Sequence, residues 1–326
     1  MSYSDIYGHE KQIEILKRAQ IQERVGHAYL FNGAPGIGKR TLALEFARAL
    51  NCTAFDEQND ACGRCLSCRK IEHHNHPDIA QIAADGQFIR INAVREIQEQ
   101  MRFRPLEATR RVFIIDDADR MNEQAANALL KTLEEPTVHN LLILITARPH
   151  TLPRTILSRC RQMRFQPLTT ADVVRYLRDK LNMEEKQAVL LAGISGGSPG
   201  LALEQNKDET IAGRQEILNM LGATRSKNPL SLLSFASFFG RDKKEIKLSL
   251  SIIKTVFRDA MVFKETGRQA MLINQDNMPL IESLSSRLSG EQLIRNIALT
   301  ENAAETIDLN VNKSLTLEVM AFKLSL

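Results

Sequence analysis

The stretch GAPGIGKRT at residues 33–41 carries the residue types of a phosphate-binding loop. Gly33, Gly38 and Lys39 match the pattern G-x-x-x-x-G-K-[ST], in which glycines let backbone N–H groups approach phosphate oxygens and the lysine reaches the β- and γ-phosphates. The pattern departs at Arg40, where a serine or threonine hydroxyl would ligate Mg²⁺. The stretch therefore predicts a site for ATP or ADP that lacks one magnesium ligand and is formed by Gly33, Gly36, Gly38 and Lys39.

Further polar residues are expected to face this loop. Asp116 follows the apolar run VFII, and a carboxylate at the end of such a strand is placed to hold Mg²⁺ directly or through water. Asp117 comes next, where ATPases of this kind usually carry a glutamate that orients the attacking water. A base displaced by about an ångström can lower the rate ~100-fold. Thr41 lies one residue past the missing hydroxyl, about 100° further around the helix, and at best contacts the α-phosphate.

Four of the five cysteines lie close together, in a run C-x2-C-x2-C preceded by one further cysteine: Cys52, Cys62, Cys65 and Cys68. Two-residue spacing lets successive thiolates face one tetrahedral Zn²⁺ at about 2.3 Å. Disulfides are rare in cytosolic proteins, and an iron–sulfur cluster or metal-free thiols are the alternatives to zinc. Four cysteines complete such a site, so the nearby histidines are not expected to be ligands.

The order of secondary-structure elements places these residues in one framework. Apolar runs predict strands at residues 27–33, 78–85, 110–119 and 140–148. Helical periodicity predicts helices at residues 9–20, 39–52, 91–103 and 122–136. This alternation is typical of a parallel sheet that helices cover on both faces. After residue 166 the pattern predicts helices only.

The same pattern predicts three domains. Residues 1–166 are expected to form an α/β nucleotide-binding core that contains the cysteine module at residues 52–68. Residues 167–208, which end near the glycine-rich stretch GISGGSPG, are expected to form a small helical lid. Residues 209–326 are amphipathic throughout and predict an all-α C-terminal domain.

Composition bounds the functional classes. The 326 residues are 43% hydrophobic and 25% charged, as in an ordinary globular protein. The net charge of +4 does not by itself indicate nucleic acid. Two segments are dense in arginine: residues 102–111, which are expected to be a solvated face, and residues 154–164, for which that interpretation is not favoured. Only 5% of residues are aromatic, which argues against a base-stacking platform. The N-terminus lacks a signal-peptide pattern and no apolar run suits a membrane helix, so we expect a cytoplasmic protein without membrane contact.

Three stretches carry a family resemblance: HAYLFNGAPGIGKRTLA, IIDDADRMNEQAANALLKTLEEP and ILSRC. Together they resemble the clamp-loader branch of the AAA+ superfamily, strongly over residues 5–205 and weakly over the C-terminal third, through NVNKSLTLEVMAFKL. The resemblance implies an AAA+ P-loop parallel sheet with an inserted zinc module, then a helical lid and an all-α collar. The collar would hold a hetero-pentameric ring together.

The resemblance also implies roles for single residues. Arg159, within Ser158-Arg159-Cys160, would act in trans as an arginine finger in the neighbouring subunit's ATP site, where such fingers contribute roughly 10³- to 10⁵-fold in rate. Thr146 occupies the family's sensor position beside the γ-phosphate. The family carries a structural zinc at its four-cysteine module, which favours zinc over an iron–sulfur cluster here.

Departures from the pattern of the ATP-hydrolysing subunits bear on function. Arg40 replaces the magnesium-binding hydroxyl, Asp117 replaces the catalytic glutamate, and Gly200 stands where hydrolysing subunits usually carry a sensor arginine. We therefore expect weak nucleotide binding and slow or no hydrolysis by this chain itself.

The expected partners follow from the same resemblance. They are the gamma/tau and delta subunits of the ring, the sliding clamp, and primer–template DNA contacted through its backbone. The favoured interpretation is a ring subunit that hydrolyses ATP slowly or not at all. The first alternative is the ATP-hydrolysing gamma/tau motor itself, and the second is a zinc-dependent nucleic-acid-binding module. No carboxylate set for two-metal nucleotidyl transfer is evident in the sequence. Any DNA polymerase activity would therefore belong to a polymerase holoenzyme that contains this chain, and not to the chain itself.

Overall fold

The computed structural model describes residues 2–54, 60–84, 86–205, 208–224, 228–240, 242–309 and 311–326. The chain divides into two compact units. The first comprises Met1–Asp172 and Ser198–Gly200, and the second comprises Val173–Gly197 and Leu201–Leu326. The expected boundaries near residues 166 and 208, and the division into three domains, stay predictions.

The first unit is built on a five-stranded parallel sheet with the strand order β2-β3-β4-β1-β5. The strands are β1 Ala28–Asn32, β2 Ile79–Ile82, β3 Arg111–Ile115, β4 Asn140–Thr146 and β5 Arg161–Arg164. Every residue of β3 and β4 is buried, as expected for strands that helices cover on both faces. The predicted parallel sheet is confirmed. The strand β5 was not predicted, because only Met163 in its sequence RQMR is apolar and buried.

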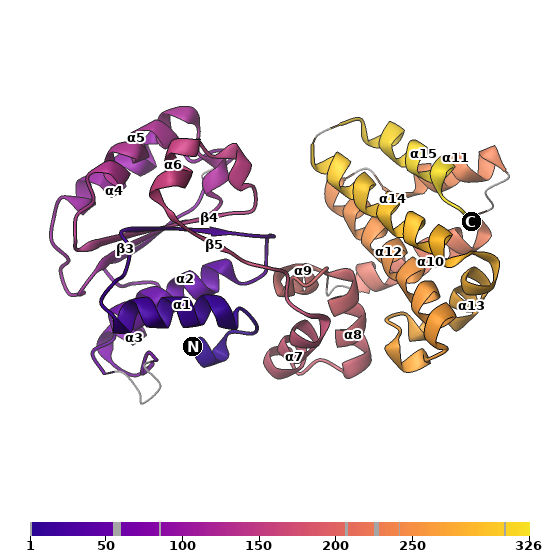
Figure 1. The fold of residues 1–326 in the computed structure, drawn as a ribbon, viewed down its shortest axis with the longest axis horizontal. Helices are drawn as coiled ribbons and strands as arrows, with labels where there is room; N and C mark the ends of the chain where they lie inside the picture. The colour runs from indigo at the N-terminus through magenta and orange to yellow at the C-terminus, as the bar shows by residue number, and fades with distance from the viewer. Residues whose placement is uncertain are drawn as a thin grey trace. The chain divides into compact units, whose positions relative to one another are not determined.

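Helices cover both faces of this sheet, with α1 and α2 on one face and α4, α5 and α6 on the other (Figure 1). The helices are α1 Glu10–Ile21, α2 Lys39–Leu50, α3 Leu66–Glu72, α4 Ile91–Met101, α5 Glu123–Glu134 and α6 Arg154–Arg159. Short 3-10 helices lie at Tyr3–Asp5, Ala118–Arg120 and Pro149–Thr151. The predicted helices at residues 9–20, 39–52, 91–103 and 122–136 are therefore confirmed, apart from their ends.

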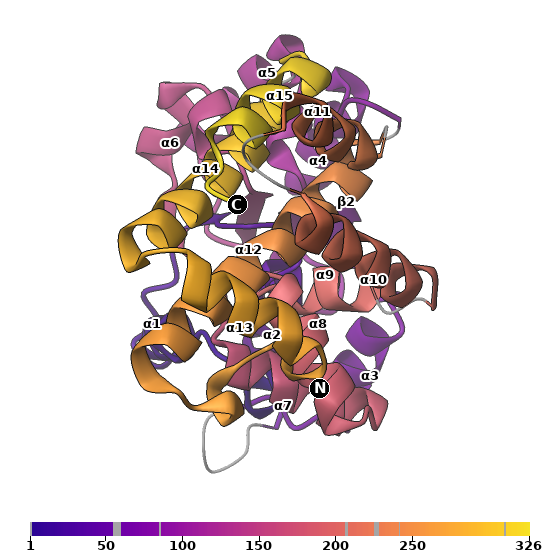
Figure 2. The same cartoon turned by 90° about the vertical axis from the view of Figure 1, so that its right-hand side faces the viewer.

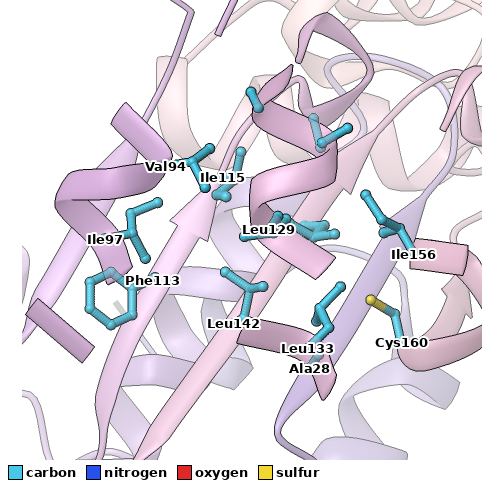
Figure 3. Packing of buried hydrophobic residues seen from close by; sticks show 14 of the residues in the cluster. Ala28, Val94, Ile97, Phe113, Ile115, Leu129, Leu133, Leu142, Ile156 and Cys160 are labelled. Atoms are coloured by element: carbon cyan, nitrogen blue, oxygen red, sulfur yellow. The ribbon is translucent and has the colours of Figure 1, made fainter. Parts of the chain in front are cut away.

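An apolar core joins the sheet to α4, α5 and α6 (Figure 3). Side chains from all three helices converge on Phe113 of β3 and Leu142 of β4. Among these helix side chains are Val94, Ile97, Leu129 and Ile156. The core fixes α5 and α6 on one platform, and the bounds of α5 follow from local signals. Its N-cap is Asn122, whose side chain accepts a hydrogen bond from the Ala125 N–H at 2.8 Å, and it ends at Glu134, before Pro136.

A buried ion pair anchors the loop between α4 and β3. The Asp78 side chain is fully buried, and Arg111 donates to its Oδ1 from Nε at 2.9 Å and from Nη2 at 2.7 Å. The segment at residues 102–111 was expected to be a solvated face. For Arg111 that expectation is wrong, because its guanidinium closes a buried pair instead of facing water.

Helices make up the second unit and the segments that lead into it, as predicted after residue 166. They are α7 Thr170–Leu181, α8 Glu185–Ile194, α9 Pro199–Glu204, α10 Asp208–Ala223, α11 Pro229–Phe238, α12 Lys243–Thr266, α13 Met278–Arg287, α14 Gly290–Asp308 and α15 Lys313–Lys323. Short 3-10 helices lie at Gln269–Met271 and Gln275–Asn277. The long helix α12 packs against α13 and α14, and α11 packs against α15 (Figure 2).

Candidate functional site

The glycine loop connects β1 to α2 at the carboxyl edge of the parallel sheet. Asp116 follows β3 at the same edge, and Thr146 ends β4, where it pairs in register with Asn32 of β1. The carboxyl edge of an open α/β sheet is where ligands bind in such folds. The fold thus brings the loop, Asp116 and Thr146 to one edge, as the sequence predicted, while their roles in nucleotide binding stay predictions.

The loop depends on glycine at its first position. A Cβ atom added to Gly33 would lie 2.5 Å from the carbonyl oxygen of Phe165, so no other residue fits there. Gly36 and Gly38 have φ angles of 71° and 100°, which side chains disfavour. The loop can therefore bring its backbone as close to a ligand as a phosphate-binding loop requires.

Lys39 is folded back onto this loop. Its Nζ donates to the carbonyl oxygens of Gly33 and Ala34, both at 2.6 Å, and the residue is 6% exposed. Burial lowers the pKa of Lys39, although the carboxylates of Asp116, Asp117 and Asp119 oppose that shift. These two carbonyl bonds use two of the three N–H donors of the ammonium group.

Arg40 is hydrogen-bonded to the neighbouring strand β2 and acts electrostatically on Asp116. Its Nε donates to Oε1 of Gln81, on β2, at 3.0 Å. Burial, together with the charge of Asp117, raises the pKa of Asp116, and the cations of Arg40 and Lys39 only partly offset this. Position 40 therefore supplies a cation and no hydroxyl to this edge of the sheet.

The two remaining predicted residues of the site are Asp117, which follows Asp116, and Thr41, which follows Arg40. Asp117 has a left-handed backbone, with φ 49° and ψ 48°, and its carboxylate is 59% exposed and 3.8 Å from Arg120. Thr41 lies half-buried in the first turn of α2. The catalytic role of Asp117 and the nucleotide contact of Thr41 stay predictions.

The hydroxyl of Thr146 is already bonded on both sides. It donates to Oδ1 of Asp119 at 2.6 Å and accepts from the Arg148 N–H at 2.9 Å. Arg148 also donates to Oδ2 of Asp119 from Nε at 2.9 Å and Nη2 at 2.7 Å. Burial raises the pKa of Asp119, but the bonds from Thr146 and Arg148 outweigh it and lower that pKa. The sequence analysis did not identify Asp119 and Arg148, although both flank predicted site residues.

The segment Ser198–Gly200, which belongs to the first unit, lies on the glycine loop. The Ser198 Oγ donates to the carbonyl oxygen of Pro35 at 2.9 Å, and the Gly200 N–H donates to that of Gly36 at 2.9 Å. A Cβ atom added to Gly200 would lie 2.8 Å from the Cα of Gly36. Only glycine therefore permits this close approach of the two backbones.

Arg159 is the last residue of α6, with a side chain 35% exposed. Its Nη2 lies 2.8 Å from Oε1 of Glu134, and its Nη1 donates to the carbonyl oxygen of Thr155 at 3.1 Å. Cys160, the next residue, is buried, and burial raises the pKa of its thiol to about 12. The arginine is thus held at the surface by a buried neighbour and two polar contacts.

The four predicted cysteines form one cluster. The sulfur atoms of Cys52, Cys62, Cys65 and Cys68 all lie within 4.8 Å of one another. Tetrahedral zinc with Zn–S bonds of about 2.3 Å separates its sulfurs by about 3.8 Å, so the cluster fits a four-coordinate metal with little adjustment.

The environment of the cluster favours the thiolate at some of its cysteines and the protonated thiol at others. Backbone N–H groups of residues 62, 65 and 68 point at the sulfurs of Cys52, Cys62 and Cys65, at 3.3, 3.4 and 3.4 Å. Burial raises the pKa of Cys65, but N–H groups of Thr53 and Cys68 outweigh it and lower that pKa to about 6. Burial raises the pKa of Cys68. A metal that binds all four sulfurs must therefore displace protons.

The parallel sheet and the glycine loop together define a P-loop α/β core followed by a helical region. A family model described as "DNA polymerase III, delta subunit" matches residues 8–169, and one described as "DNA polymerase III, delta subunit, C terminal" matches residues 208–325. The chain belongs to this family of DNA polymerase III clamp-loader subunits.

Individual relatives agree with this assignment. DNA polymerase III subunit delta prime of Bacillus subtilis is 28% identical, over 92% of this chain and 91% of the relative. DNA polymerase III subunit tau of the same organism is 31% identical, over 86% of this chain but only 48% of the relative. Among solved structures, a gamma subunit-related protein of Thermotoga maritima aligns with a TM-score of 0.40 at 20% identity, over 95% of this chain and 97% of that one.

Within the described ranges of the chain, no helix is both long enough and apolar enough to cross a membrane.

Proposed function

We propose that this chain is the delta prime subunit of a DNA polymerase III clamp loader, a ring position that hydrolyses ATP slowly or not at all. The observation that carries the proposal is the packing of Gly200 on Gly36, where a side chain would begin 2.8 Å from a backbone atom. Hydrolysing subunits are expected to place a sensor arginine at this position. With the loop in this form, no such arginine can be accommodated.

Other features of the site support the same choice. Lys39 is bonded to its own loop, Arg40 is directed to Gln81, and the Asp117 carboxylate lies beside Arg120. The relatives include both delta prime and tau subunits, so the choice between these two rests on the site. Arg159, in contrast, is intact and partly exposed, which suits a finger offered to a neighbour.

The proposed role sets the partners of the chain. It would join gamma/tau motors and a delta subunit in a hetero-pentameric ring, with residues 209–326 in the collar. The ring would open the sliding clamp and place it on primer–template DNA, which it would contact through backbone phosphates. Arg159 would complete the ATP site of the adjoining motor.

ATP turnover by the purified chain tests the first part of this proposal. We expect a rate at least ~100-fold below that of a gamma/tau subunit, because the base and a magnesium ligand are both altered. Lys39→Ala should leave the residual rate unchanged. Turnover at the rate of a motor, abolished by Lys39→Ala, would instead identify the chain as a gamma/tau motor.

We further propose that the cysteine cluster holds one structural zinc ion, with all four sulfurs as ligands. The purified protein should contain about one zinc per chain, and Cys68→Ser should remove most of it and lower the melting temperature. Cys160→Ser, at a buried cysteine outside the cluster, is the control and should retain the metal. Iron with visible absorption, or no metal in protein purified without chelator, would refute the zinc assignment.

A further inference from the structure

The contact between Glu134 and Arg159 links two helices of the first unit. Glu134 is the last residue of α5 and Arg159 the last of α6, and the two helices pack against each other over the apolar core. The Oε1 of Glu134 lies 2.8 Å from Nη2 of Arg159, while the carbonyl oxygen of Thr155 accepts from Nη1 at 3.1 Å. The guanidinium of Arg159 is therefore held at two points, by Glu134 at the end of α5 and by the carbonyl oxygen of Thr155 in its own helix.

These two contacts restrict the side chain of Arg159 but do not use all of its N–H donors. A guanidinium offers five N–H donors in a rigid plane. The contacts to Glu134 and Thr155 engage its two terminal nitrogens, and the side chain is still 35% exposed. An arginine finger must present such donors to a phosphate in one orientation. A finger held in place beforehand loses less conformational freedom when the transition state forms.

We propose that Glu134 is a positioning residue for Arg159: its carboxylate orients the guanidinium toward the ATP site of the adjoining subunit. The proposal rests on the trans role of Arg159 proposed above. Glu134 itself is half-exposed, so the pair contributes little to folding stability. Its expected effect is on the rate of the neighbour's hydrolysis.

The test uses the assembled ring with gamma/tau and delta subunits, under single-turnover conditions. Glu134→Gln keeps the shape of the side chain but removes its charge. We expect it to slow hydrolysis in the site served by this subunit about 3- to 10-fold, the cost of immobilising one long side chain. The ATP concentration at half-maximal rate should not change, because the finger acts in the transition state.

Three further variants make the test specific. Glu134→Asp retains the charge and should recover part of the rate. Glu135→Gln removes the same charge from the next residue, which is also exposed, and should behave as wild type. In the Arg159→Ala background, Glu134→Gln should have no additional effect, because a positioning residue acts only through the residue that it positions.

The outcomes separate this inference from the proposed function. If Arg159→Ala leaves the ring's hydrolysis unchanged, the trans role fails, and the positioning role with it. If Arg159→Ala slows hydrolysis but Glu134→Gln matches wild type, only the positioning role is wrong. Equal slowing by Glu134→Gln with and without Arg159 would show a structural effect and overturn the inference, and melting temperatures identify any variant that folds poorly.

Discussion

Replacing Arg159 with alanine is expected to slow ATP hydrolysis in the adjoining motor site at least ~10³-fold. The guanidinium would supply positive charge where negative charge develops on the γ-phosphate, and its immediate neighbours Ser158 and Cys160 carry no such charge. Cys160 beyond it is buried, and Ser158 before it bonds to the Thr155 carbonyl oxygen at 3.1 Å. The effect should be confined to the rate, with ring assembly unchanged.

The measurement is single-turnover hydrolysis by rings that contain the variant subunit. One finger serves one site, so the fast phase should lose the amplitude of one site, which reappears in a much slower phase. Arg159→Lys keeps a charge but not the planar fork of donors, and should recover little of the rate. Arg154→Ala, at the exposed first residue of α6, is the control and should hydrolyse as wild type. A fast phase of full amplitude with Arg159→Ala would refute the trans role.

The framework of the first unit was predictable from the sequence because its signals are local. Buried strands such as LLILIT are continuous apolar runs, and the glycine loop between a strand and a helix fixes the position of Lys39. The cluster of four cysteines was predictable for the same reason, because cysteines that are close together in the sequence can bring their sulfur atoms together.

The features that the sequence did not predict depend on contacts between distant segments. The strand β5 reads as a charged run, and only its pairing with β1 makes it a strand. The bond from Gly200 to Gly36 joins residues 164 positions apart, and no local pattern announces it. The same holds for Glu134 and Arg159, which meet only because α5 and α6 share one core. Sequence patterns therefore identified local elements and candidate residues, but not which distant residues contact one another.

Asp78 is the clearest case of a residue whose importance appears only in the structure, and Asp78→Asn is expected to destabilise the first unit by about 3–5 kcal/mol. Its carboxylate accepts backbone N–H bonds from Leu106 at 2.9 Å, Glu107 at 2.8 Å and Ala108 at 3.0 Å, besides the pair with Arg111. An asparagine would turn an NH₂ group toward some of these donors and leave the Arg111 charge buried without a counterion.

The effect of pH provides a second measurement on the same residue. Burial raises the pKa of Asp78, but the N–H bonds and Arg111 outweigh it and lower that pKa to about 2. The unfolded value is about 3.9, so ionised Asp78 stabilises the folded state fully above pH ~5, by about 2–3 kcal/mol, and this stabilisation is lost as pH falls toward 2. The free-energy difference between wild type and Asp78→Asn, from denaturant unfolding, should therefore shrink over that range.

Glu107→Gln is the matched control for this experiment. It removes one negative charge from the same loop, but the Glu107 side chain is 45% exposed and its ion pair with Lys70 is partly solvated, so we expect a loss below about 1 kcal/mol. A loss as large as that of Asp78→Asn would mean that loop charge, and not the buried pair, sets the stability. If both losses are small, an amide at position 78 holds the loop as well as the carboxylate does, and the buried charge pair does not set the stability. Only a large loss for Asp78→Asn that declines with acid, beside a small one for Glu107→Gln, fits a buried carboxylate that anchors the loop between α4 and β3.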